Sequence, residues 1–145
     1  FLGTPEYMSP EAADAVGGDV DTTSDVYSLG VLLYELLVGA VPFDARQLRT
    51  AGLAELLRVI REVEAPPLPA KLTQLGQTLS EIAERRSTNP LTLRKEVAGE
   101  LNLIALKAVE KRRERRYGSV QMLWEDVQRF LDDHPVQAQP PTMGY

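Results

Sequence analysis

The sequence predicts a mainly α-helical fold, on two observations. Apolar residues recur three and four positions apart along most of the chain, which is the spacing of one face of a helix. No segment shows a convincing alternation of apolar and polar residues, which would mark a strand, and proline and glycine residues separate the apolar stretches. We therefore expect successive helices packed around a common core.

The size and composition of the chain fit one soluble globular domain, with 145 residues of which 43% are hydrophobic and 26% charged. A net charge of -5 argues against nucleic acid as a partner, because a protein that binds it must neutralise many phosphates. The chain has no cysteine, which excludes a disulfide framework and is compatible with a reducing cytoplasm. Its longest apolar run, Leu29 to Val38, is far shorter than the ~20 residues that cross a bilayer, so we expect a cytoplasmic protein.

The most hydrophobic segment predicts the central helix of the domain. Its apolar residues cover most of a helical circumference, so we expect this helix to be buried on nearly all sides. They are Val26, Leu29, Val31, Leu32, Leu33, Tyr34, Leu36 and Leu37. Residues 21–24 supply N-cap candidates, Gly39 is placed to end the helix in a left-handed conformation, and Pro42 prevents a restart.

The middle of the chain predicts shorter helices. One apolar stripe indicates an amphipathic helix on the surface of the core: Leu53, Leu56, Leu57, Ile60 and Val63. The prolines within residues 65–69 should end it. Residues 70–88 are expected to be partly helical, because Gly76 interrupts their helical spacing, and Asn89 and Pro90 predict the N-cap and first residue of a short helix reaching Val97.

The last third predicts two more helices and a tail. The apolar stripe of the first helix comprises Leu101, Ile104, Ala105, Ala108 and Val109. That of the second comprises Val120, Leu123, Trp124, Val127, Phe130 and Leu131. Ser119 is the expected N-cap of the second helix, Trp124 and Phe130 are expected in the core, and His134 is expected to cap its C-terminal end. Residues 135–145 should form an extended tail.

Three motifs in a fixed order carry a family resemblance. They are FLGTPEYMSPE over residues 1–11, SDVYSLGVLLYELLVGAVPF over 24–43 and LIALKAVEKRRERRYGSVQMLWEDVQRFL over 103–131. Together they resemble the C-terminal lobe of a bacterial eukaryotic-like serine/threonine protein kinase, from the end of the activation segment onward. The resemblance implies a partial kinase domain over residues 1–134, without N-lobe β-sheet or catalytic loop. It also implies the start of a juxtamembrane linker over 135–145, with a membrane anchor of the parent protein after residue 145.

The resemblance also assigns a substrate-binding loop. Gly3, Thr4, Pro5, Glu6 and Tyr7 would form the wall against which the substrate residue after the phosphorylated serine or threonine rests. Thr4 would support the missing catalytic aspartate by a hydrogen bond, so no catalytic residue is expected in this chain. The alternative for Thr4 is an ordinary turn hydroxyl after Gly3.

Three further residues receive structural roles from the same resemblance. Glu11 and Arg116 would form a buried ion pair, with Arg115 as the rival partner. Asp25 would anchor the catalytic loop, or would be a first-turn aspartate that interacts with the helix dipole, which we favour in this chain.

The chain lacks the motifs that bind ATP and magnesium and the motif that carries the catalytic base. It contains no G-x-G-x-x-G, V-A-I-K, H-R-D or D-F-G, and with one histidine and no cysteine it offers no expected metal site. ATP and magnesium are implied for the parent kinase, and the chain alone should be inactive.

Expected partners are proteins with acceptor serine or threonine, the missing N-lobe and, through exposed apolar surface, a second copy. The alternative is a non-catalytic helical docking module, and the basic run at 111–116 is interpreted as a solvated helix end.

Overall fold

The computed structural model describes residues 5–14, 21–46 and 51–140, and within these ranges it is helical without strands. The prediction of a mainly α fold is confirmed. In chain order the elements are η1 (Pro5–Tyr7), α1 (Thr22–Val38), α2 (Leu53–Glu62), α3 (Leu68–Gln74), α4 (Gln77–Arg85), α5 (Pro90–Ala98), α6 (Glu100–Ala108), η3 (Arg113–Arg115) and α7 (Val120–Leu131). None of the described helices is both long and apolar enough to cross a membrane.

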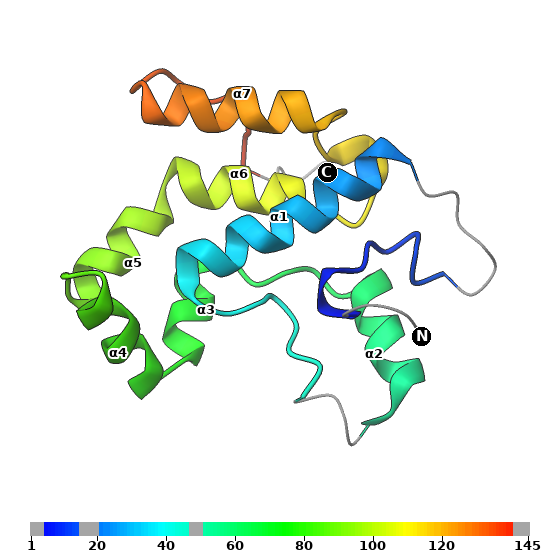
Figure 1. Ribbon diagram of the computed structural model, residues 1–145, viewed down its shortest axis with the longest axis horizontal. Coiled ribbons are helices and arrows are strands. Elements are labelled where there is room, and N and C mark those ends of the chain that lie inside the picture. Colours follow the sequence, from blue (N-terminus) through cyan, green and yellow to red (C-terminus); the bar gives the residue numbers. More distant parts are fainter. Residues whose placement is uncertain (1–4, 15–20, 47–50, 141–145) are drawn as a thin grey trace.

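Helix α1 runs through the middle of the domain and organises the other elements (Figure 1). Helices α6 and α7 lie along one side of it, η1 and α2 lie by its N-terminal half, and α3, α4 and α5 gather at its C-terminal end. Helix α1 passes close to α6 at Gly30, where an added Cβ would lie 2.6 Å from the Cβ of Ala108. A residue without a side chain is therefore needed for these two helices to pack at this distance.

Both ends of α1 are capped as the sequence predicts. The Asp21 carboxylate accepts the amide of Thr23 at 2.8 Å, and the Ser24 hydroxyl accepts the amide of Asp21 at 3.4 Å. At the other end Gly39 adopts a left-handed φ of 78°, and its amide donates to the carbonyl of Glu35 at 2.7 Å.

The expected burial of α1 on nearly all sides is wrong. Val26, Val31 and other inward residues are fully buried, but Leu29, Leu32 and Leu36 are 39%, 45% and 72% exposed. These leucines lie at positions i, i+3 and i+7, and so share one face of the helix. In the described part of the chain no element covers that face.

The region between α2 and α6 contains more helix than the sequence indicated. Helix α2 ends at Glu62, before the prolines, and α3 begins at Leu68 with Pro69 in its first turn, where a missing amide hydrogen breaks no intrahelical bond. Gly76, with φ of 58°, separates α3 from α4, so the interruption is a joint between two helices. The predicted cap of α5 is confirmed, because the Asn89 side chain accepts the amide of Thr92 at 2.9 Å.

Helix α7 begins at its predicted cap but differs from expectation in burial. The Ser119 hydroxyl accepts the amide of Met122 at 3.2 Å, and Phe130 packs partly buried against the core. Trp124, expected in the core, is 56% exposed, because it lies with Val120 and Leu131 on the outward face of the helix. His134 is exposed and closes the helix through its backbone amide, which donates to the carbonyl of Arg129 at 2.8 Å.

The segment after α7 folds back onto the core. The buried carboxylate of Asp126 accepts the amides of Gln137 and Ala138 at 2.7 and 3.0 Å, and Glu100 accepts the amide of Val136 at 3.0 Å. Ala138 is only 3% exposed. We call residues 136–138 the C-terminal strap.

Candidate substrate-binding site

The loop that carries the candidate substrate site is fastened to α1 through Tyr7. The Tyr7 hydroxyl donates to Oε1 of Glu35 at 2.5 Å, and the Ser28 hydroxyl donates to the Tyr7 carbonyl at 2.8 Å. Donation to the Glu35 carboxylate, with some burial, raises the pKa of Tyr7 to about 12. The amide of Met8 donates to the carbonyl of Pro5 at 3.1 Å and closes η1. Gly3 and Thr4, which the sequence assigns to the same loop, lie outside the described residues.

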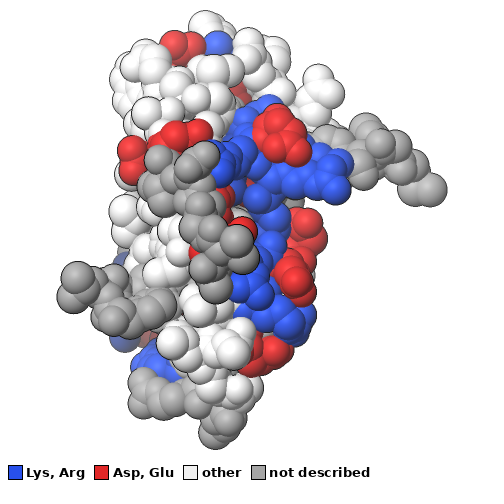
Figure 2. Space-filling model, turned by 90° about the vertical axis from the view of Figure 1, so that its right-hand side faces the viewer, with Lys and Arg blue, Asp and Glu red and all other residues white. Residues whose placement is uncertain are grey.

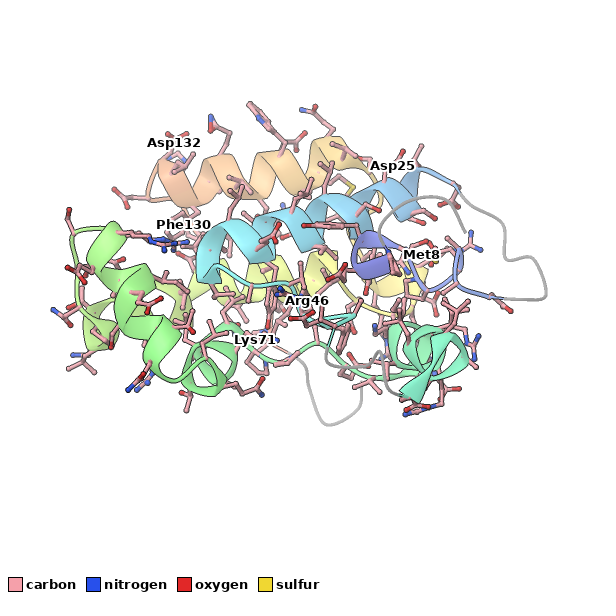
Figure 3. The ribbon with its side chains drawn as sticks, turned by 60° about the horizontal axis from the view of Figure 1, so that its bottom comes forward. Met8, Asp25, Arg46, Lys71, Phe130 and Asp132 are labelled. Atoms are coloured by element: carbon pink, nitrogen blue, oxygen red, sulfur yellow. The ribbon has the colours of Figure 1, made fainter. Side chains whose placement is uncertain are left out.

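A cleft of about 260 Å³ opens beside this loop. Its lining comes from three elements and the loop after α1: Glu6, Tyr7, Glu35, Gly39, Ala40, Val41, Asp44, Arg46, Lys71 and Leu75. Asp44 and Arg46 form an ion pair at 3.3 Å. Figure 3 shows Arg46 and Lys71 close to one another below α1. The cleft therefore presents carboxylates and cations to whatever chain lies along the loop.

Lys71 is the most buried cation of this cleft. The residue is 7% exposed and its Nζ donates to the carbonyl of Pro42 at 3.2 Å. Burial lowers the pKa of Lys71, although the charge of Asp44 opposes that shift. Its ammonium thus ties α3 to the loop after α1, and both of these segments line the cleft.

The structure brings Glu11 and Arg116 together in a buried, two-pronged ion pair. Nη1 of Arg116 lies 2.6 Å from Oε2 of Glu11, and Nη2 lies 2.6 Å from Oε1. The two side chains are 0% and 6% exposed, with Arg116 the more buried. The Ser24 hydroxyl donates to the same carboxylate at 2.6 Å. This pair joins the segment after η1 to the loop before α7 and to the first turn of α1.

Electrostatics favour the ionised form of Glu11. Burial raises its pKa, but the hydrogen bonds from Arg116 and Ser24 outweigh burial, and the pKa of Glu11 is lower than usual. Arg116 also donates to three carbonyls, those of Thr23, Glu110 and Lys111. Both charged groups are therefore satisfied away from water.

Asp25 lies exposed in the first turn of α1, and its position is labelled in Figure 3. Its carboxylate accepts no hydrogen bond from a described residue. A carboxylate at this position interacts favourably with the positive end of the helix dipole. It is also open to donors outside the described ranges.

Sequence reasoning missed several residues that shape the site. Glu35 interrupts the apolar run Leu29 to Val38, and a carboxylate inside that run is the signal that could have pointed to a specific partner. Lys71 gave no signal, because its burial depends on the loop after α1. Within the described ranges, His, Asp and Glu side chains form no group of three or more that could hold a metal ion.

Comparison with known proteins agrees with this architecture. A model of the protein kinase domain matches residues 1–127. Over 134 residues the chain is 33% identical to serine/threonine-protein kinase Pkn1 of Myxococcus xanthus, a match that covers 92% of this chain and 15% of Pkn1. Over 137 residues it is 30% identical to serine/threonine-protein kinase PknB of Mycobacterium tuberculosis, covering 94% of this chain and 17% of PknB. The chain thus spans less than a fifth of these relatives.

Proposed function

Because the chain belongs to the protein kinase family, we propose that it is the substrate-binding part of the helical lobe of a serine/threonine kinase. Such an enzyme transfers the γ-phosphate of ATP to serine or threonine of proteins. The observation that carries the proposal is the double attachment of Tyr7 to α1 beside the cleft. A loop held in this way offers the acceptor peptide a rigid wall.

The chemical contribution of this chain is orientation. Phosphoryl transfer requires the acceptor hydroxyl in line with the transferred group, and a held acceptor removes part of the entropic barrier. In the proposal, Pro5, Glu6 and Tyr7, with Gly3 and Thr4, hold the residue after the acceptor. Thr4 supports the catalytic aspartate of the remaining kinase domain, so the chain alone is inactive.

The nucleotide and its metal are assigned to the rest of the kinase domain. The described residues form no carboxylate cluster that fits magnesium, and the chain has no glycine loop that fits the phosphates. In the proposal, the residues of this chain act on the acceptor side of the reaction.

The exposed leucines of α1 form a surface that could contact the N-terminal part of the same kinase, which supports that part as a partner. Leu29, Leu32 and Leu36 form an apolar face on the helix that also carries Asp25, and an uncovered face of this kind favours association. We propose that the preceding part of the kinase domain covers it and that isolated copies self-associate through it. We also propose a cytoplasmic location for the lobe, with membrane anchorage of the whole kinase after residue 145.

The test is a fusion of this chain behind the N-terminal part of the Pkn1 kinase domain, cut at the equivalent position. We expect the fusion to phosphorylate a serine peptide and the chain alone to transfer no phosphate. Tyr7→Phe should lower kcat/KM of the fusion by about tenfold, because the loop loses its hydrogen bond to Glu35. A tenfold change corresponds to ~1.4 kcal/mol of activation free energy.

The matched control is Tyr34→Phe. It also removes one tyrosine hydroxyl, which donates to the carbonyl of Pro66 at 2.7 Å, but Tyr34 is fully buried and lies away from the loop. Equal losses in the two variants would contradict the role of Tyr7. A folded but inactive fusion would favour the non-catalytic docking module. Phosphate transfer by the chain alone would refute the assignment of the nucleotide site to the rest of the kinase domain.

A further inference from the structure

An unusual feature for an acidic chain is a continuous band of cations on one face of the molecule. Figure 2 shows this band running from the segment before α7 down to α2, with carboxylates along its edges. Its residues are Arg58, Arg61, Lys111, Arg112 and Arg113, which we call the basic belt. The chain as a whole has a net charge of -5, so the belt is a local concentration of positive charge in an acidic protein.

Part of the belt surrounds a hollow. An open depression of about 310 Å³ is lined by Arg61, Lys111 and Arg113 together with Pro10, Glu11, Asp14 and Glu114. Arg61 donates to the carbonyl of Ala13 at 3.3 Å, and Lys111 Nζ donates to the carbonyl of Ile60 at 2.5 Å. The first bond holds α2 against the segment after the candidate substrate loop, and the second holds α2 against the segment between α6 and η3. The hollow is thus a fixed part of the fold.

Not all charges of the belt are neutralised within the protein. Arg58 is paired with Glu55 and Glu62, and Arg113 is paired with Asp21 at 3.0 Å. Among the described residues no carboxylate lies within ion-pair distance of Arg61, Lys111 or Arg112. Within the described ranges these three neighbouring cations therefore form no ion pair, although Glu64 and Glu110 act on Lys111 at longer range.

The surroundings of Lys111 favour the binding of an anion beside its amine. Its Nζ lies 4.5 Å from the centre of the Phe43 ring and 5.5 Å from that of Tyr27. Burial, aided by the charge of Arg116, lowers the pKa of Lys111 to about 8 although Glu64 and Glu110 oppose the shift. A carboxylate brought beside this amine stabilises the ammonium form and raises that pKa.

We propose that the basic belt docks a carboxylate-rich segment of a protein substrate. The cations that form no ion pair with a described carboxylate come from α2 and from the segment between α6 and η3. This separation suits several single charges spaced along an extended peptide better than one compact phosphate. Glu55, Glu62, Asp14 and Glu114 lie beside the belt. A phosphate backbone carries a charge on every unit and would meet these carboxylates, whereas a peptide can place uncharged residues opposite them. Pro10 and Glu11 of the hollow follow the candidate substrate loop closely, so a docked segment lies on the same stretch of chain as the acceptor.

The docking inference depends on the proposed function in one respect, which is the identification of the bound protein as a substrate. Binding itself needs neither ATP nor the rest of the kinase domain. If the fusion is active but the chain does not bind the acidic peptide, the docking inference alone is refuted. If the chain binds the acidic peptide but the fusion is inactive, the proposed function alone is refuted.

The experiment is a fluorescence-anisotropy titration of a labelled ten-residue peptide of alternating glutamate and serine with this chain. We expect saturable binding that weakens between about 50 and 200 mM salt, as charge contacts are screened. The double variant Arg61→Gln/Arg112→Gln should bind at least tenfold more weakly. Arg112→Gln alone should bind about threefold more weakly, and Arg112 is exposed, without a hydrogen bond that the fold needs.

The matched control is Arg85→Gln/Lys95→Gln, which removes the same charge from exposed positions on α4 and α5. It should change affinity less than twofold, and circular dichroism and melting should show that all variants remain folded. Equal losses in both double variants would overturn the proposal, as would the absence of saturable binding. Tighter binding of an oligothymidylate of equal charge, or more than tenfold tighter binding of a peptide with a single phosphoserine, would also overturn it.

Discussion

Removing either partner of the Glu11–Arg116 pair should cost a large share of the stability of this domain. The pair is almost fully buried, and both oxygens of Glu11 are held at 2.6 Å by Arg116. Deleting one partner of a buried pair leaves an uncompensated charge, which typically destabilises by ~3–5 kcal/mol. A whole domain is stabilised by only about 5–15 kcal/mol.

The structure ranks the two truncations. Glu11→Ala leaves Arg116 with its bonds to the carbonyls of Thr23, Glu110 and Lys111, so part of its charge stays solvated by the protein. Arg116→Ala removes those three bonds as well and leaves Glu11 with the Ser24 hydroxyl. We therefore expect Arg116→Ala to be the more destabilising of the two.

The assay is thermal and urea unfolding of each variant, followed by circular dichroism. At a few degrees per kcal/mol for a domain of this size, Tm should fall by roughly 10–20 °C. Glu125→Ala is the control, because the pair between Glu125 and Arg129 is long, at 3.8 Å, and partly exposed, and such pairs contribute only ~0–1 kcal/mol. Truncation variants that melt within about 2 °C of the parent chain would refute the reasoning.

The pH dependence of the same pair has a definite sign. Glu11 has a lower pKa in the folded than in the unfolded chain, so its contribution is fully present above the unfolded value of ~4.3 and is lost as pH falls through the folded value. The difference in stability between the parent chain and Glu11→Gln should therefore shrink on acidification below about pH 4. A difference that stays constant down to about pH 2 would contradict the assigned charge state.

Three further changes test other parts of the fold. Gly30→Ala places a Cβ 2.6 Å from that of Ala108 and should destabilise by ~1–3 kcal/mol in urea unfolding, while adding Ala108→Gly should recover part of the loss. Asp126→Asn weakens the acceptor of the strap and of the Tyr117 hydroxyl, so limited proteolysis should cut near residues 136–138 faster than in the parent chain. Leu32→Ser/Leu36→Ser removes exposed apolar surface and should lower the apparent mass in light scattering without lowering Tm, whereas an unchanged mass would exclude the leucine face of α1 from self-association.

How far the sequence predicts the fold depends on the range of the interactions involved. The caps at Asp21, Gly39, Asn89 and Ser119 are correct because a cap is a contact within a few residues, and local chemistry decides it. The joint at Gly76 was visible as an interruption, but the sequence did not reveal that helices stand on both sides of it. Local signals mark the end of a helix more reliably than the structure of the next segment.

Burial was harder to predict, since it depends on which neighbour covers each face. Leu36 and Trp124 have the hydrophobicity of core residues, yet they are 72% and 56% exposed. Ala138 and Asp126, with weak or opposite signals, are buried because the C-terminal strap returns to α7. Helical spacing identifies an apolar face but carries no information about its partner.

For the candidate site, the sequence by itself carried the resemblance from which a substrate loop is proposed, and it supplied the acid and the base that were candidates for the buried pair. Tertiary structure alone decided that Tyr7 is held by Glu35, that Lys71 lines the cleft, and that cations from α2 and the segment before α7 share one hollow. The physical reason is separation along the chain. Glu11 and Arg116 stand 105 positions apart, and only the packing around α1 brings such groups within hydrogen-bonding distance.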